Sequence, residues 1–260
     1  MDIDVALKRA KLRCKTGDVD GGFRLLYKIL ATQKSPPLVY DRIGRLLSQY
    51  AGTSIQNKNF RVLVCGQFTT AWLRTTLIAL AWRDDCLLEV VEGDYDNMMQ
   101  SLYRAVENNE KYDAVVLAPW HNDLFEHLQR ASAQQCLSDQ LALWESTWQL
   151  INRMGTRLVQ VGYDYCYPGP RGSFQDSQSG GQIDAVRCLN RELRTNLPEQ
   201  AYFVDVEQLT GQIGRHGAYD ARRYYWTKQP FSEDGLLQLT RHIWAGLRAT
   251  LFGSKKVLIL

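Results

Sequence analysis

Five short apolar segments alternate with longer amphipathic segments along most of this sequence, and the alternation restricts the folds that the chain can adopt. The apolar segments cover residues 61–65, 87–91, 113–118, 158–161 and 202–205. Runs this short that are rich in Val, Leu and Ile are typical of buried parallel strands. Strands that alternate with helices predict an α/β fold, a doubly wound parallel sheet in a flavodoxin-like three-layer sandwich.

Helical periodicity fills the intervals between the predicted strands. The longest such segment, 134–154, places Leu137, Trp144 and Trp148 on one side of a helix. The expected helices are 69–82, 95–106, 134–154, 181–195 and 232–251.

The first fifty residues contain helical patterns and no predicted strand. Residues 4–34 predict two short helices joined at 16–18, and Pro36-Pro37 suits the first turn of a third helix that ends near 51–52. We therefore divide the chain into a helical N-terminal extension (1–58) and an α/β domain (59–253). The extension either packs on the α/β domain or presents a docking surface for a partner.

Composition excludes several classes of function. The formal net charge is only +3 and the basic residues are scattered among acids, so no nucleic-acid partner is expected. The sequence has no apolar stretch of membrane-spanning length and no signal peptide, so we expect a cytoplasmic protein without a membrane partner. Its six cysteines are widely spaced, which predicts free thiols rather than a zinc site.

In a doubly wound sheet the ligand crevice lies beyond the carboxyl ends of the strands. Gly66 and Gln67 follow the first strand and are candidate ligand-binding residues. Thr69 and Thr70 come next, at the start of the first helix of the α/β domain. They are candidate catalytic hydroxyls, or they simply cap that helix, whose free amide groups suit an oxyanion.

Two further strand ends supply candidates. His121 follows the third strand and is either a general base or a histidine of a surface loop. Gly162 follows the fourth strand and begins a long loop that contains Asp164 and Cys166. Because long loops are often functional, Asp164 is a candidate for ligand binding and Cys166 for catalysis, although Cys166 could be merely buried.

A second long irregular segment, 214–231, is dense in cations and aromatic residues. Asp220, Arg222, Arg223 and Lys228 are its candidate ligand-binding residues. Such a segment could bind an anionic ligand, for instance phosphopantetheine or a nucleotide phosphate, or it could be a solvated loop pinned by its aromatic side chains.

Two of these blocks resemble those of SGNH (GDSL-like) hydrolases. That family carries Gly-Asp-Ser after its first strand and Asp-x-x-His before its last helix. Here Phe68 stands at the serine, Thr227 at the aspartate and Pro230 at the histidine. The resemblance implies an SGNH-like fold whose catalytic triad is lost, since an unassisted hydroxyl is a poor nucleophile.

A more specific resemblance is to the N-terminal half of FkbH-like proteins. The segments that carry it are 66–73, 90–96, 112–117, 226–232 and 255–260. In that family the strand that corresponds to 255–260 continues into a haloacid-dehalogenase-type (HAD-IIIC) phosphatase domain that binds Mg²⁺. The resemblance implies that residues 254–260 begin such a domain, which is missing here, and that this fragment needs no cofactor itself.

FkbH-like proteins take a glyceryl unit from a phosphorylated glycerate and load it onto an acyl carrier protein, in polyketide and related pathways. The resemblance thus implies an accessory domain that docks the carrier, binds its phosphopantetheine arm or handles the acyl group. Two alternatives stay open. One is an active esterase or acyltransferase that uses Thr69, Thr70 or a thiol such as Cys65 or Cys166, and the other is a pure protein-interaction module.

Overall fold

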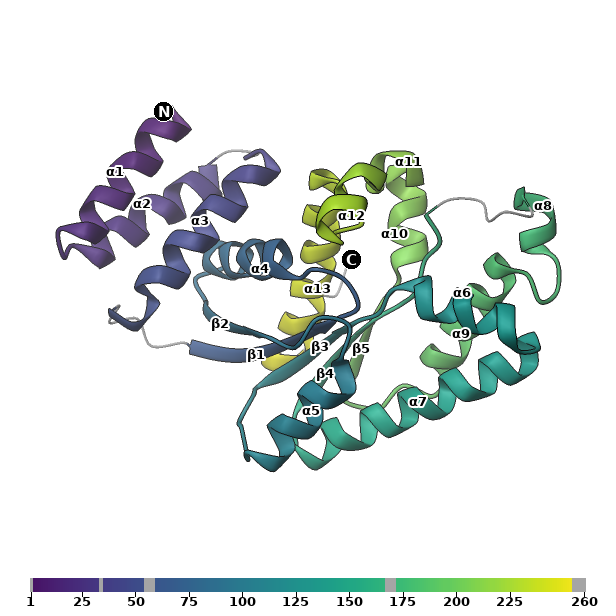
Figure 1. The fold of residues 1–260 in the computed structure, drawn as a ribbon. Helices are drawn as coiled ribbons and strands as arrows, with labels where there is room; N and C mark the ends of the chain where they lie inside the picture. Colours follow the sequence, from purple (N-terminus) through teal and green to yellow (C-terminus); the bar gives the residue numbers. More distant parts are fainter. Residues whose placement is uncertain (1, 33–34, 54–58, 167–171, 254–260) are drawn as a thin grey trace, which may run out of the picture.

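The structure, a computed structural model, describes residues 2–32, 35–53, 59–166 and 172–253. Its centre is a parallel sheet of five strands in the order β2-β1-β3-β4-β5 (Figure 1). The strands are β1 (Asn59–Gly66), β2 (Leu87–Glu92), β3 (Ala114–Ala118), β4 (Arg157–Val161) and β5 (Ala201–Val204). This order confirms the predicted doubly wound sheet, because the chain reverses direction across the sheet between β2 and β3.

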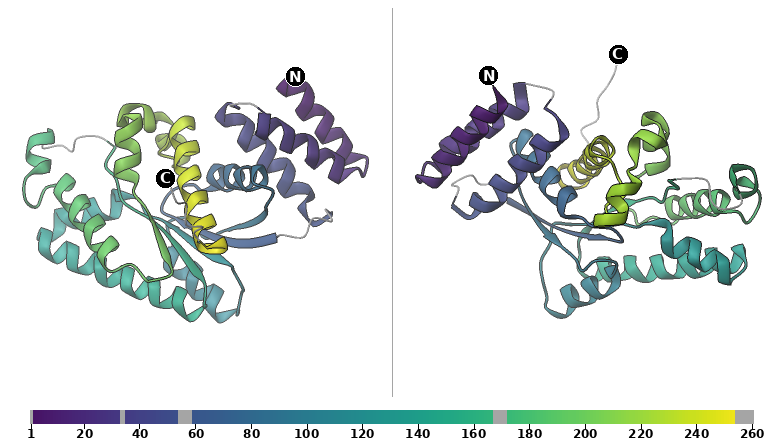
Figure 2. Two further views of the ribbon diagram at one scale, coloured as in Figure 1. Left: turned by 180° about the vertical axis from the view of Figure 1, so that it is seen from behind. Right: turned by 45° about the horizontal axis from the view of Figure 1, so that its top comes forward.

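Helices cover both faces of the sheet, which completes the three layers (Figures 1 and 2). One face carries α4 (Ala71–Arg83), α10 (Val206–Ile213), α11 (Arg215–Ala218) and α13 (Glu233–Phe252). The other face carries α5 (Met98–Glu107), α6 (His121–Arg130), α7 (Ala133–Arg153) and α9 (Gln182–Thr195). The short helices α8 (Gly172–Ser177) and α12 (Ala221–Thr227) lie in the long loops.

The side chains of each strand alternate between these two layers. Val62 and Val64 of β1 belong to the core on the α4 side, whereas Leu63 and Cys65 belong to the core on the α7 side. A strand buried on both faces needs apolar residues at consecutive positions, which explains the unbroken apolar runs in the sequence.

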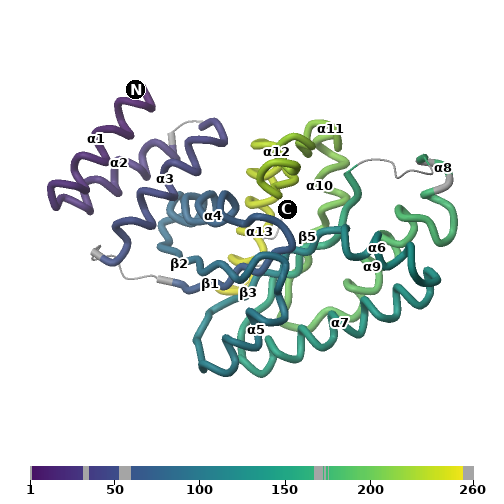
Figure 3. The backbone as a smooth tube through the Cα atoms, in the orientation of Figure 1, coloured from purple at the N-terminus to yellow at the C-terminus, as the bar shows by residue number. Residues whose placement is uncertain are grey.

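Three helices and a short 3₁₀ turn precede the sheet: α1 (Ile3–Lys15), α2 (Val19–Thr32), α3 (Pro37–Tyr50) and η1 (Ala51–Thr53). They lie on the α4 side of the sheet, away from α6, α7 and α9 (Figure 3). Gly44 of α3 sits directly on Thr75 of α4, where an added Cβ would come within 1.8 Å of the Thr75 carbonyl oxygen. The extension therefore packs on the α/β domain.

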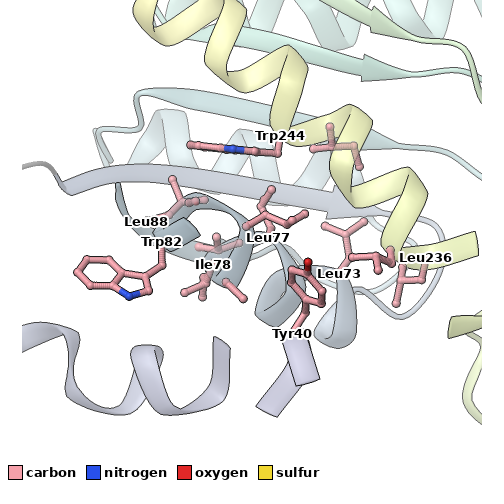
Figure 4. Packing of buried hydrophobic residues seen from close by; sticks show 14 of the residues in the cluster. Tyr40, Leu73, Leu77, Ile78, Trp82, Leu88, Leu236 and Trp244 are labelled. Atoms are coloured by element: carbon pink, nitrogen blue, oxygen red, sulfur yellow. The ribbon is translucent and has the colours of Figure 1, made fainter. Parts of the chain in front are cut away.

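Helix α4 is buried on nearly every side. Figure 4 shows its residues Leu77, Ile78 and Trp82 between Tyr40 of α3 and Trp244 of α13. The indole nitrogen of Trp82 donates to the carbonyl of Phe23 at 3.1 Å. Buried residues of this helix are Leu73, Thr75, Thr76, Leu77, Ile78, Ala79, Leu80, Ala81 and Trp82.

Two predictions about irregular segments were wrong. The residues after β3 do not form a surface loop, because His121 is the first residue of helix α6. The segment 214–231 contains the short helices α11 and α12, and an isolated antiparallel bridge joins Tyr219 to Phe231 within it. The strand expected at 257–260 lies outside the described residues.

Candidate functional site

A cleft of about 490 Å³ opens at the carboxyl edge of the sheet. Helix α6 and the residue before it contribute one wall, and the segment from Tyr219 to Tyr224 contributes the opposite wall. The loop after β4 adds Cys166, and α9 adds Gln182. The cleft thus lies where the predicted topology places the ligand crevice.

Aromatic rings form the floor of this cleft. Trp120 is their centre, with its ring centroid 5.8 Å from that of Tyr219 and 6.0 Å from that of Phe231. Phe68, at the position of the expected nucleophile, is only 1% exposed and lies edge-on to both Trp120 and Phe231. Phe68 is therefore part of the core beneath the cleft.

His121 is held in the wall of the cleft as a neutral ring. Its ring stacks on Phe125 with centroids 4.6 Å apart, and its Nδ1 lies 2.9 Å from the carbonyl oxygen of Asp164. Since a carbonyl only accepts, Nδ1 carries the proton and Nε2 keeps a lone pair. Burial lowers the pKa of His121 from 6.5 to about 4, so the ring is uncharged at neutral pH.

Asp164 is a structural anchor beneath the cleft. Its carboxylate accepts hydrogen bonds from the hydroxyls of Thr210 and Tyr219, the latter at 2.6 Å, and pairs with Arg215 at 3.1 Å. Burial raises the pKa of Asp164 despite these partners. With both oxygens engaged, this carboxylate ties the β4 loop to α10 and α11.

The two candidate thiols are both protonated at neutral pH. Burial raises the pKa of Cys166, which lines the cleft, and the neighbouring Asp164 raises it further. Burial also raises the pKa of Cys65 to about 12, and that side chain is fully buried on the α7 side of β1. A reactive thiol needs the opposite shift, toward the thiolate.

Gln67 holds the ends of β1 and β3 together. Its side-chain oxygen accepts from the backbone amide of Trp120 at 2.9 Å, and its side-chain nitrogen donates to Asp123 at 2.6 Å. Gly66, one residue earlier, has no room for a side chain, because an added Cβ would lie 2.7 Å from Thr70.

Two carboxyl groups flank the Gln67 amide. Burial raises the pKa of Asp96, and repulsion by Asp123 raises it further. Burial likewise raises the pKa of Asp123, and repulsion by Glu126 adds to it. Hydrogen bonds from Gln67 lower the pKa of both carboxyl groups and so partly offset these increases.

The hydroxyls of both threonine candidates already have partners. Thr69 donates to the carbonyl of Thr227 at 2.5 Å, and Thr70 donates to Glu92 at 2.8 Å. Neither side chain caps α4. The backbone of Thr69 also holds the segment after α12, because its amide donates to the carbonyl of Lys228 and its carbonyl accepts from Gln229.

The structure separates the four candidates of segment 214–231. Only Asp220 lines the cleft, and its carboxylate accepts from the amide of Arg223 and so caps α12. Arg223 pairs with Glu233 at 3.0 Å and lies over the ring of Trp72. Arg222 and Lys228 are both exposed, and the Lys228 ammonium lies 5.4 Å from the centre of the Tyr224 ring. Binding of an anionic ligand by this set stays a prediction.

Gly162 has a backbone role at the end of β4. Its amide donates to Val204 at 2.9 Å, and an added Cβ would lie 2.7 Å from the ring of Phe203. The next residue, Tyr163, is fixed by two hydrogen bonds with the side chain of Asn190.

Several cleft residues escaped the sequence analysis. They are Trp120, Asn122, Phe125, Gln129, Gln182 and Tyr224. Asn122 donates to the Tyr224 hydroxyl at 2.6 Å, which joins the two walls. The available signal was the proximity of Trp120 and Asn122 to the end of a predicted strand, the position that identified His121.

Among the described residues, no cluster of three or more His, Cys, Asp or Glu side chains is arranged to hold a metal ion. The magnesium ion expected for a phosphatase domain stays a prediction. None of the described helices combines the length and the apolar character needed to cross a bilayer.

A family model described as "FkbH, N-terminal domain" matches residues 61–245. No curated protein matches the sequence significantly. The structure resembles the N-terminal part of a Bacteroides fragilis protein that contains a phosphatase domain and was solved in complex with Mg. The TM-score is 0.67 at 15% identity, covering 79% of this chain and 56% of that one. The chain thus spans about half of that structure.

A second similar structure is a lipase from a goat rumen metagenome. The TM-score is 0.51 at 13% identity, and the match covers 73% of this chain and 97% of the lipase. Likeness at this level of identity shows the fold alone. It supports the predicted SGNH-like architecture.

Proposed function

Because the chain belongs to the family of FkbH N-terminal domains, we propose that it handles the acyl-acceptor side of a glyceryl transfer reaction. In this proposal the longer protein takes a glyceryl unit from a phosphorylated glycerate and loads it onto an acyl carrier protein. The cleft at the sheet edge receives the phosphopantetheine arm of the carrier. A magnesium-dependent HAD-type domain, following residue 253, removes the phosphate.

The charge of the cleft carries this proposal. Its described lining includes the carboxylates of Glu126 and Asp220 and neither Lys nor Arg. Such a lining repels a phosphorylated glycerate. The lining suits the uncharged, extended pantetheine arm. The amide side chains of Asn122, Gln129 and Gln182 can each donate hydrogen bonds to the amides of the arm and accept hydrogen bonds from them. The aromatic walls would cover the methylene groups.

His121 fits a positioning role better than a catalytic one. Its Nε2 lone pair can accept a hydrogen bond from a thiol in the cleft. As a general base it would be weak, because a conjugate acid with a pKa of about 4 lies roughly four units below the thiol that it would deprotonate. We infer that this ring orients the arm thiol.

The accessory role also agrees with the state of the candidate nucleophiles. Both threonine hydroxyls are engaged in hydrogen bonds, and the position of the expected serine holds the buried ring of Phe68. One observation favours the alternative, an acyltransferase that uses a thiol: Cys166 and His121 line the same cleft. The raised pKa of the Cys166 thiol weighs against that alternative, because it keeps the thiol protonated.

The test is glyceryl loading by the protein together with its downstream phosphatase domain. The substrates are a phosphorylated glycerate and a holo acyl carrier protein, and the mass of the intact carrier reports the product. We expect the double substitution Gln129→Ala and Gln182→Ala to raise the KM for the carrier about tenfold while the release of phosphate continues. Gln149→Ala, at an exposed position of α7, is the matched control.

Unchanged loading by the cleft variant would contradict the proposal. The esterase alternative has its own measurement, turnover of a p-nitrophenyl ester by the 260-residue chain. Turnover that Thr69→Ala, Thr70→Ala or Cys166→Ala abolishes would replace the accessory role by a catalytic one.

A further inference from the structure

The outer face of α12 exposes two large aromatic side chains. Trp226 is 82% exposed and Tyr225 is 77% exposed, which makes them the most exposed large apolar residues of the described chain. None of the α12 residues is buried. Side chains of this size rarely stay so open on a monomer unless they serve in recognition, and Trp and Tyr are enriched at the energetic centres of protein interfaces.

Two cations accompany the aromatic pair. Arg222 is three and four residues before Tyr225 and Trp226, a spacing that places all three on one side of the helix. Lys228 follows at the C-cap in a left-handed conformation, with φ of 57°, and its ammonium lies 5.4 Å from the centre of the Tyr224 ring, at the border with the cleft. Neither cation forms an ion pair within the described part of the chain, in contrast to Arg223, which pairs with Glu233.

This face borders the mouth of the cleft. Ala221 and Tyr224, on the other side of the same helix, line the cleft itself. The helix is fixed at both ends, because the amide of Asp220 donates to Pro230 and the carbonyl of Lys228 accepts from Thr69. A fixed surface loses little conformational entropy when a partner binds.

We propose that Arg222, Tyr225, Trp226 and Lys228 form the docking surface for the acyl carrier protein. This inference rests on the proposed function, since the bound carrier would present its arm to the neighbouring cleft. The complementary chemistry is a helical surface with carboxylates around an apolar centre. The aromatic pair supplies most of the affinity, and the two cations steer the approach of an acidic partner.

The position of the face favours a partner that arrives from solution. Helix α13 carries the chain from beside α12 toward the opposite edge of the sheet, where the ring of Phe252 packs 5.1 Å from that of Phe60 at the start of β1. The last described residues therefore lie far from the aromatic pair along a helix of 20 residues.

Binding of holo acyl carrier protein to the immobilised 260-residue chain tests the inference, with free pantetheine as a second probe. We expect Trp226→Ala to raise the Kd for the carrier about 30-fold and Arg222→Glu to raise it about fivefold at low salt. Neither variant should change the binding of pantetheine, which measures the cleft alone. Tyr103→Ala on α5 and Arg24→Glu on α2 are controls at exposed positions remote from the cleft.

Three results would overturn the inference. Carrier binding that is unchanged in both α12 variants removes the docking role, and the proposed function stands if the cleft variant still raises the KM for the carrier in glyceryl loading. Absence of carrier binding by the unmodified chain also removes it, and pantetheine binding then decides the fate of the proposed function. Conversion of a dimer into a monomer by Trp226→Ala, with carrier binding unchanged, would assign this face to self-association.

Discussion

The ring of Phe68 lies edge-on to the ring of Phe231, with their centroids 5.6 Å apart and their planes at 68°. This contact joins the segment after β1 to the segment before α13, the two blocks that supply nucleophile and base in SGNH hydrolases. In this chain the same junction is filled with aromatic side chains.

A serine introduced at position 68 should therefore cost stability without creating hydrolytic activity. Phe68→Ser removes a fully buried ring, and we expect the free energy of unfolding to fall by about 4 kcal/mol. The measurement is chemical denaturation, with an ester assay on the same sample. Phe174→Ser, at an exposed position of α8, should change stability by less than about 0.5 kcal/mol. Ester turnover by the Phe68→Ser variant would count against the structural role.

A second prediction concerns Gln67. Gln67→Glu replaces the amide that donates to Asp123 with a further negative charge, between carboxyl groups whose pKa is already raised. We expect a loss of about 3 kcal/mol at pH 7, since a donor is lost and a repulsion is added.

The loss should shrink as the pH falls toward about 5, because the folded state takes up protons at these carboxyl groups before the unfolded state does. Denaturation curves between pH 5 and 7.5 measure it. Gln67→Met removes the amide without adding charge, so its loss should depend less on pH. Parallel pH profiles of the two variants would refute this electrostatic account.

The neutral ring of His121 gives a third prediction, with the opposite sign. Its pKa in the folded state is about 4 against an ordinary value of 6.5, so the unfolded state takes up the proton first as the pH falls. Stability should decrease from pH 6.5 to about pH 4, by up to about 3 kcal/mol from this group. His121→Gln should flatten that part of the profile, and an NMR titration should place the midpoint of the wild-type ring near pH 4.

His242→Gln controls for the loss of one histidine, because that side chain is exposed and its Nδ1 contacts only the carbonyl of Gln238 among the described residues. A midpoint of the His121 ring near 6.5 would show that the ring is solvated, and the positioning role would be lost with it.

The contact between α3 and α4 yields a fourth prediction. Gly44→Ala places a methyl group 1.8 Å from a backbone oxygen that cannot move aside, so we expect a loss of at least about 2 kcal/mol. Gly211→Ala is the control: it lies on the exposed side of α10 with no atom within 4 Å, and it should stabilise the protein by about 0.5 kcal/mol through helix propensity. Equal behaviour of the two variants in denaturation would refute the close approach.

The sequence predicted the central strands well because they are buried on both faces, as the apolar run at 113–118 illustrates. The helices that were missed are those with little buried surface. Helix α6 fully buries only Leu124, with Phe125 and Leu128 partly buried beside it, and α12 buries no residue. The apolar periodicity of a sequence reflects how much of a helix is buried against the core, and both helices turn much of their surface to the cleft or to solvent.

The candidate site was predicted in position and only partly in content. Strand ends located Gln67, His121 and Cys166, because topology alone brings these ends together. The contact of His121 with Asp164 could not be foreseen, since it involves a backbone carbonyl and the conformation of the β4 loop. The different roles of Arg222 and Arg223 could not be foreseen either, because Arg223 is held by an ion pair with Glu233, which is ten residues away in the sequence.

The burial of α4 on both sides has a consequence for anyone who handles this domain in pieces. The similarity to the family begins at residue 61, yet Tyr40, Ile43 and Leu47 of α3 are core residues that cover the outer side of α4. A protein trimmed to the matched region would expose the apolar side chains on that side of α4 to water, and we expect it to aggregate. The region that matches the family is therefore shorter than the region that should fold on its own. A variant made for expression should keep helix α3.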